Sequence, residues 1–97
     1  MPQVHFVEEY ERHVAELIAS YPIDEAMSLA VGGNYDKFGR LMADILAGLG
    51  VRGDMSLIDL GCGSGRLAKY LGQQFPRLSY VGIDVVQALL DYAQIVV

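Results

Sequence analysis

The sequence lacks the features that mark membrane, secreted and nucleic-acid-binding proteins. Its apolar runs are too short to span a bilayer, and no basic stretch followed by an apolar one opens the chain. Lys and Arg number 7 against 12 Asp and Glu, without a basic cluster that would suit a phosphate backbone. The single cysteine, Cys62, excludes an intramolecular disulfide and is ordinary for a reducing cytosol. We therefore expect a cytoplasmic protein with no membrane partner and no nucleic-acid partner in this segment.

The sequence has the composition of a globular protein and three amphipathic helical patterns. Hydrophobic residues make up 53% of the 97 residues, enough to bury a core. Apolar spacing predicts a helix over residues 4–20 and a shorter one over 25–31, with Asp24 as its N-cap. Asn34 is expected to cap a third helix, which Gly50 closes. Its apolar stripe consists of Phe38, Leu41, Met42, Ile45, Leu46 and Leu49.

The composition changes after the third predicted helix. Residues 55–60 are an apolar run without regular polar alternation, which predicts a strand buried on both faces of a parallel sheet. Residues 78–83 are predicted to form the second strand. Residues 66–75 between them have a helical pattern and suit the right-handed crossover of a βαβ unit. A further helix is expected after the second strand. We therefore predict an N-terminal helical segment over residues 1–53 and the start of an α/β cofactor-binding domain over 54–97.

Three glycines separate the first predicted strand from the helix that follows it. Gly61, Gly63 and Gly65 allow a sharp turn with positive φ and let a ligand lie against the backbone. The N–H groups at the helix start favour an anionic group such as a carboxylate. Asp84 ends the second predicted strand at the same edge of the sheet, where its carboxylate can accept both hydroxyls of a ribose. This order of elements predicts a nucleotide-type binding site.

The spacing of the glycines discriminates between nucleotide ligands. A dinucleotide fingerprint G-x-G-x-x-G needs glycine at position 66, where the chain has Arg66, and no G-K-S/T forms a phosphate loop. Plainer interpretations stay open: Asp84 also suits the N-cap of the next helix, and Cys62 suits a small packing residue. Arg66 is expected to be solvated or paired with a carboxylate.

The segments I-D-L-G-C-G-S-G-R-L-A and Y-V-G-I-D-V resemble the first two motifs of the Rossmann-like (class I) S-adenosylmethionine-dependent methyltransferases. The likeness covers about residues 56–92. It implies a Rossmann-like parallel sheet, S-adenosylmethionine as the cofactor and methyl transfer as the activity of the intact protein. The fold class expected is therefore α/β, with N-terminal helices followed by the first βαβ unit of this sheet.

The resemblance also implies a set of cofactor-binding residues. Along the chain these are Tyr35, Asp59, Gly61, Cys62, Gly63, Gly65, Asp84 and Val85. The glycines and Cys62 line the methionine moiety through their backbone, and Asp59 orients its amino group directly or through water. Asp84 binds the ribose hydroxyls, and Val85 packs on the adenine. Tyr35 sits where some members place an aromatic residue over the cofactor.

The family's fold resembles a seven-stranded sheet, of which this chain supplies two strands. We therefore expect an N-terminal, truncated portion of a larger methyltransferase, inactive by itself and self-associating through exposed strand edges. Residues on the substrate side typically follow the fourth strand, so no catalytic residue is assigned, and no metal ligand is expected. The acidic balance favours a small molecule or a protein as methyl acceptor. A non-catalytic Rossmann-like binding or assembly domain and a fragment of a nicotinamide-dependent oxidoreductase stay open as alternatives.

Overall fold

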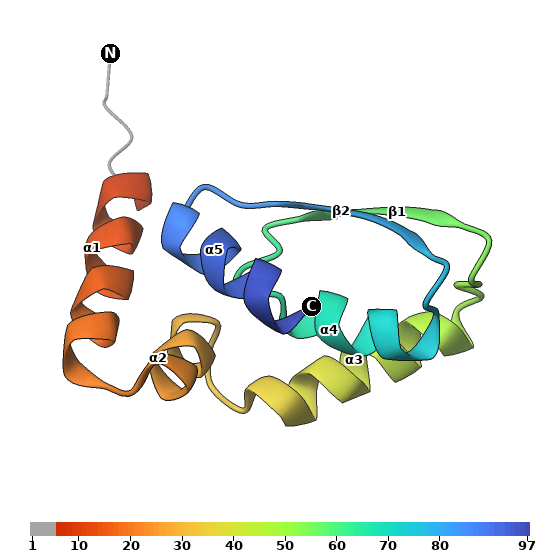
Figure 1. The fold of residues 1–97 in the computed structure, drawn as a ribbon, viewed down its shortest axis with the longest axis horizontal. Helices are drawn as coiled ribbons and strands as arrows, with labels where there is room; N and C mark the ends of the chain where they lie inside the picture. Colours follow the sequence, from red (N-terminus) through yellow and green to blue (C-terminus); the bar gives the residue numbers. More distant parts are fainter. Residues whose placement is uncertain (1–5) are drawn as a thin grey trace, which may run out of the picture.

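The computed structural model describes residues 6–97 as an α/β fold of five helices and two strands (Figure 1). The elements are α1 (Phe6–Ser20), α2 (Ile23–Ala30), α3 (Tyr35–Gly48), β1 (Ser56–Leu60), α4 (Arg66–Gln74), β2 (Ser79–Ile83) and α5 (Gln87–Val96). The predicted fold class is confirmed, and the predicted start of the first helix at residue 4 lies outside the described residues. Within residues 6–97, no helix combines the length and apolar character that crossing a membrane requires.

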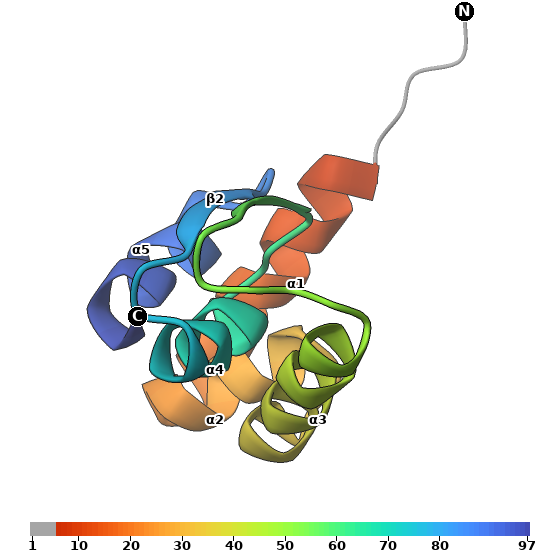
Figure 2. The same ribbon diagram turned by 90° about the vertical axis from the view of Figure 1, so that its right-hand side faces the viewer.

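The two strands form a parallel pair joined by α4. Ser56 lies opposite Ser79 and Leu60 opposite Ile83 in the register, so both strands end at the same edge of the sheet. Figures 1 and 2 both show α3 and α4 on one side of this pair. The predicted βαβ unit is therefore present, and the glycine turn after β1 lies beside the residue that follows β2.

The strands are covered on only one face within the described part of the chain. Their side chains alternate between half-buried and exposed, as the two-residue period of a strand requires. Ile58 and Leu60 of β1 are 68% and 78% exposed, and Val81 of β2 is 56% exposed. The prediction that both faces of the first strand are buried is wrong for residues 6–97, because the helices of this part pack on the opposite face.

Two hydrophobic cores hold the helices in place. Val14 of α1 and Met27 of α2 pack with Leu89 of α5 in the first core. Ala43 of α3 packs with Leu71 of α4 in the second, and Leu57 of β1 lies against it. Each core therefore contains residues from both sides of position 53, and α1–α2 and α3 pack directly on the βαβ unit.

The face by which α3 meets α4 differs from its apolar stripe. Gly39 and Ala43 are buried, whereas five residues of the predicted stripe are exposed: Phe38, Leu41, Met42, Ile45 and Leu49. A Cβ atom at Gly39 would lie 2.5 Å from Tyr70 Cδ2 and 2.6 Å from the backbone oxygen of Arg66. The helices therefore approach where α3 has its smallest side chains, which rotates the apolar stripe away from the contact.

The predicted helix caps are corrected by the structure. Helix α2 begins at Ile23, so Asp24 lies in its first turn and accepts a hydrogen bond from the Tyr92 hydroxyl at 2.6 Å instead of capping the helix. Asn34 occupies the N-cap position of α3 with a left-handed φ of 51°, but its side chain makes no capping bond. The hydroxyl oxygen of Ser28 accepts the N–H of Tyr35 at 3.1 Å in its place.

Candidate functional site

The glycine turn follows β1 with the left-handed backbone that its composition predicts. The φ angles of Gly61, Gly63 and Gly65 are 76°, 60° and 87°, values that residues with a side chain rarely adopt. At Gly63 space is limiting as well, because a Cβ atom would lie 2.7 Å from Cγ1 of Val31. The turn therefore requires glycine both for its backbone and for the close approach of the chain that follows α2.

Several N–H groups of this turn are bound within the chain. Those of Gly61 and Cys62 donate to the backbone oxygen of Ile83 at 2.7 and 3.0 Å. The N–H of Gly63 donates to Oδ2 of Asp84 at 2.9 Å, and Oδ1 of Asp84 accepts the N–H of Val86 at 3.0 Å. Asp84 thus joins the glycine turn to the start of α5, for which Val86 is the N-cap residue.

A pocket of about 240 Å³ opens beside the turn, between the two strand ends. Five of the eight residues predicted to bind the cofactor line it: Asp59, Gly61, Cys62, Gly63 and Asp84. The rest of its lining consists of Tyr10, Val31, Met42, Arg66 and Leu67. The structure thus brings both predicted carboxylates to one pocket with the backbone of the turn.

Gly65 and Val85 lie outside the lining of this pocket. Gly65 is buried against α5, where a Cβ atom would lie 2.9 Å from the Cβ of Ala93. Val85 follows Asp84 and is 58% exposed, so it offers an apolar surface next to the second carboxylate. The proposed roles of these two residues in cofactor binding stay predictions.

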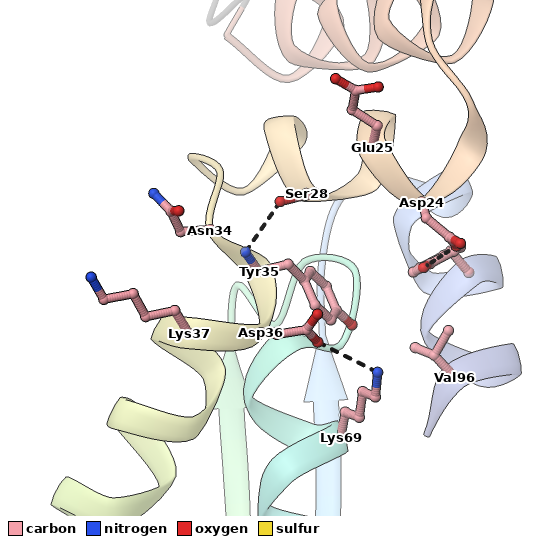
Figure 3. Close-up of a pocket in the computed structure, with 10 residues that line it drawn as sticks. Asp24, Glu25, Ser28, Asn34, Tyr35, Asp36, Lys37, Lys69 and Val96 are labelled. Carbon is pink, nitrogen blue, oxygen red and sulfur yellow. Dashed lines mark hydrogen bonds and ion pairs between the residues drawn. The ribbon is translucent and has the colours of Figure 1, made fainter.

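Tyr35 does not line the pocket beside the glycine turn. Its hydroxyl donates to the backbone oxygen of Ser64 at 2.8 Å, which braces the turn from α3. Its ring lines a separate cavity of about 650 Å³, where Asp36 and Lys69 face each other at 3.6 Å (Figure 3). The structure therefore places Tyr35 as a support of the turn, and its proposed contact with the cofactor stays a prediction.

The acidic lining affects the side chains around it. Burial raises the pKa of the Cys62 thiol, and the neighbouring Asp59 and Asp84 raise it further. The thiol therefore keeps its proton at neutral pH, which agrees with a packing role and argues against a nucleophile. Asp59 accepts the hydroxyl of Tyr80 at 2.7 Å, and burial followed by this carboxylate raises the pKa of Tyr80.

Removing the hydroxyl of Tyr35 is expected to change the alkaline stability of the chain. Burial, followed by the neighbouring Tyr70 and Asp36, raises the pKa of Tyr35 from 10.0 to about 12. A raised folded-state pKa means that the folded chain retains the proton longer, so its stabilising effect is complete below pH 10 and is lost as the pH rises through about 12. We expect the free energy of unfolding to fall over this range, and to fall less steeply in Tyr35→Phe.

Urea unfolding at a series of pH values measures this slope. At neutral pH, Tyr35→Phe should cost about 1 kcal/mol, because the hydrogen bond to Ser64 is lost. A variant with the same alkaline slope as the original chain would contradict the assignment. Tyr21→Phe is the matched control, because Tyr21 is 43% exposed at the end of α1.

Three residues outside the predicted set attach the end of α2 to the site. The Ser64 hydroxyl, fully buried, donates to the backbone oxygen of Met27 at 3.0 Å. The Tyr10 hydroxyl donates to the oxygen of Ala30 at 2.8 Å. Both connections join residues 20 or more positions apart, so no local pattern reveals them.

Arg66 is the third of these residues. Its Nη1 donates to the backbone oxygen of Val31 at 2.9 Å, and its Cζ lies 6.0 Å from the ring centre of Phe38. It is half-buried, and its partners are a carbonyl oxygen and a ring, so no carboxylate pairs with it among the described residues. The one sequence signal for it is its position directly after the third glycine.

Comparison with known proteins gives a match over the part of the chain that contains the glycine turn and Asp84. Residues 57–97 match the family model described as a methyltransferase domain. Trans-aconitate 2-methyltransferases from Yersinia pestis (strain Pestoides F) and Yersinia pseudotuberculosis serotype O:1b (strain IP 31758) are each 40% identical to this chain over 55 residues. The aligned part makes up 57% of this chain and 21% of each relative, so the chain spans about a fifth of their length. The resemblance noted from the two sequence motifs is confirmed.

Proposed function

We propose that this chain, whose residues 57–97 match the methyltransferase-domain family model, forms the cofactor-binding part of an S-adenosylmethionine-dependent methyltransferase. The observation that supports this most directly is the pocket that Asp59 and Asp84 share with the glycine turn. The family implies S-adenosylmethionine as the methyl donor. The methyl transfer itself and its acceptor belong to the proposal.

The residues of the pocket fit the chemistry of this cofactor. S-adenosylmethionine carries an ammonium group, a sulfonium and two ribose hydroxyls, and carboxylates such as Asp59 and Asp84 suit all of these. A volume of about 240 Å³ falls below the roughly 300–1,000 Å³ of a complete small-molecule site. The pocket therefore suits the methionine and ribose portions, and the exposed Val85 beside it suits the adenine.

Each proposed role follows from how its residue is held. The carboxylate of Asp84 is fixed by the N–H groups of Gly63 and Val86, so it would accept ribose hydroxyls without reorganising. The Tyr80 hydroxyl fixes Asp59 in the same way, so that it would orient the amino group. When bound, the cofactor supplies an activated methyl group for displacement by a nucleophile. The protein then contributes mainly orientation and the exclusion of water.

Titration calorimetry with S-adenosylhomocysteine tests the proposal against its alternatives. We expect the chain to release or absorb heat with S-adenosylhomocysteine and to gain thermal stability, because a ligand that binds the folded state stabilises it. NAD should produce neither effect. Binding of NAD without S-adenosylhomocysteine would favour an oxidoreductase fragment, and binding of neither would favour a non-catalytic assembly domain.

We propose a small molecule or a protein as the methyl acceptor. The balance of 7 basic against 12 acidic residues supports this choice over a nucleic acid. The name of the relatives, trans-aconitate 2-methyltransferase, supports a small molecule in particular. The match extends over 21% of those relatives, so the acceptor of this protein is not transferred from them.

A further inference from the structure

The two carboxylates of the pocket beside the glycine turn suit the cationic and hydroxyl groups of the proposed ligand, but they do not suit its carboxylate. S-adenosylmethionine carries an α-carboxylate in addition to its cationic groups. The predicted anion site was the N–H groups at the start of α4. In the turn that precedes it, the N–H groups of Gly61 and Cys62 are bound to Ile83 and that of Gly63 to Asp84. The N–H of Gly65 donates to the oxygen of Cys62 at 3.3 Å. A carboxylate that enters this pocket therefore finds four N–H groups of the turn already bound, which leaves a role for a cationic side chain as its donor.

The charge of the pocket favours a cationic donor for that carboxylate. Asp59 and Asp84 both line it, and each would repel a third carboxylate in a partly desolvated space. Arg66 lines the same pocket and is the one Lys or Arg among its described lining residues. It is also the first residue of α4, whose N-terminus adds positive potential at this point.

Two contacts hold the Arg66 side chain in place and leave most of its N–H donors available. One of its five N–H donors is bound to the backbone oxygen of Val31. Its guanidinium lies over the ring of Phe38, and no ion pair to a described carboxylate neutralises it. Two fixed contacts orient the group while the remaining donors stay available, so little side-chain entropy is lost when a carboxylate binds.

We propose that Arg66 binds the α-carboxylate of the amino-acid portion of the ligand, in the pocket that it shares with the two carboxylates that bind the cationic group and the ribose. The inference rests on the proposed function, because it assigns a residue to the same cofactor site. It also gives a reason for Arg66 at the position where a dinucleotide fingerprint would have glycine.

A comparison of two ligands on one variant tests this assignment. S-adenosylhomocysteine has the carboxylate, and its decarboxylated analogue keeps the amino group, the ribose and the adenine. We expect Arg66→Gln to bind S-adenosylhomocysteine about tenfold more weakly or worse, as for a lost charge-assisted hydrogen bond, and to bind the analogue as the original chain does. Arg66→Lys should lose less, because it keeps the charge.

The analogue controls for damage to the fold, since both ligands share the rest of the pocket. Equal weakening of both ligands in Arg66→Gln, or weakening of neither, would overturn the role of Arg66. Arg52→Gln should bind both ligands unchanged, because Arg52 is exposed and pairs with Asp54 at 3.3 Å. If the original chain binds neither ligand, the proposed function itself fails. If the original chain binds both ligands and Arg66→Gln binds them equally well, only the role of Arg66 fails.

Discussion

Asp84→Ala is expected to lower the affinity for S-adenosylhomocysteine about a hundredfold, because two hydrogen bonds from ribose hydroxyls to a charged acceptor are lost. It should also lower the free energy of unfolding by about 2–4 kcal/mol. The carboxylate accepts the N–H groups of Gly63 and Val86 at 2.9 and 3.0 Å, and alanine leaves both without that partner. Calorimetry and urea unfolding measure the two effects separately.

A control and a milder substitution separate binding from folding. Asp91→Ala removes an exposed carboxylate that accepts only the Gln87 amide among the described side chains, so affinity and stability should stay unchanged. Asp84→Asn keeps an acceptor for the turn and should lose affinity while retaining more stability than alanine. Asp84→Ala with unchanged affinity would show that this carboxylate serves the fold alone and would remove the ribose assignment.

Gly39→Ala is expected to destabilise the fold by about 2 kcal/mol through the contact between α3 and α4. Inserting a methyl group into a filled contact costs about 3 kcal/mol, and the better helix propensity of alanine returns about 1 kcal/mol. The new Cβ would lie 2.6 Å from the backbone oxygen of Arg66, which cannot move without shifting α4. Thermal or urea unfolding measures the loss.

The same substitution at Gly72 provides the matched control. Gly72 lies within α4, and a Cβ atom there would meet nothing within 4 Å. Gly72→Ala should therefore stabilise the chain by about 0.5–1 kcal/mol through helix propensity alone. A Gly39→Ala variant that is equally stabilised would show that α3 and α4 do not meet closely at this position.

The strands β1 and β2 expose apolar residues on one face. The expected self-association of the chain stays a prediction. Ile58, Leu60 and Val81 face away from α3 and α4, and among residues 6–97 no helix packs over them. An uncovered apolar face of this kind favours contact with further protein.

The sequence by itself determined the order of the elements and the chemistry of the turn. Within residues 6–97, the helix and strand limits lie within about two residues of the predicted ones, because apolar periodicity and glycine act through neighbouring residues. Gly63 has the positive φ that its position requires, for the same local reason. The convergence of Asp59 and Asp84 was also predictable, since parallel strands end at one edge.

Only the tertiary structure decided which faces meet and which donors remain for a ligand. The stripe of α3 is as apolar as a core face, yet Gly39 sets the contact because it lets α4 approach closest. Tyr35 supports Ser64, which lies 29 positions away, and Arg66 reaches Val31, 35 positions away. Such contacts depend on how separate elements pack, and periodicity along one element carries no information about the partner that another element brings to it.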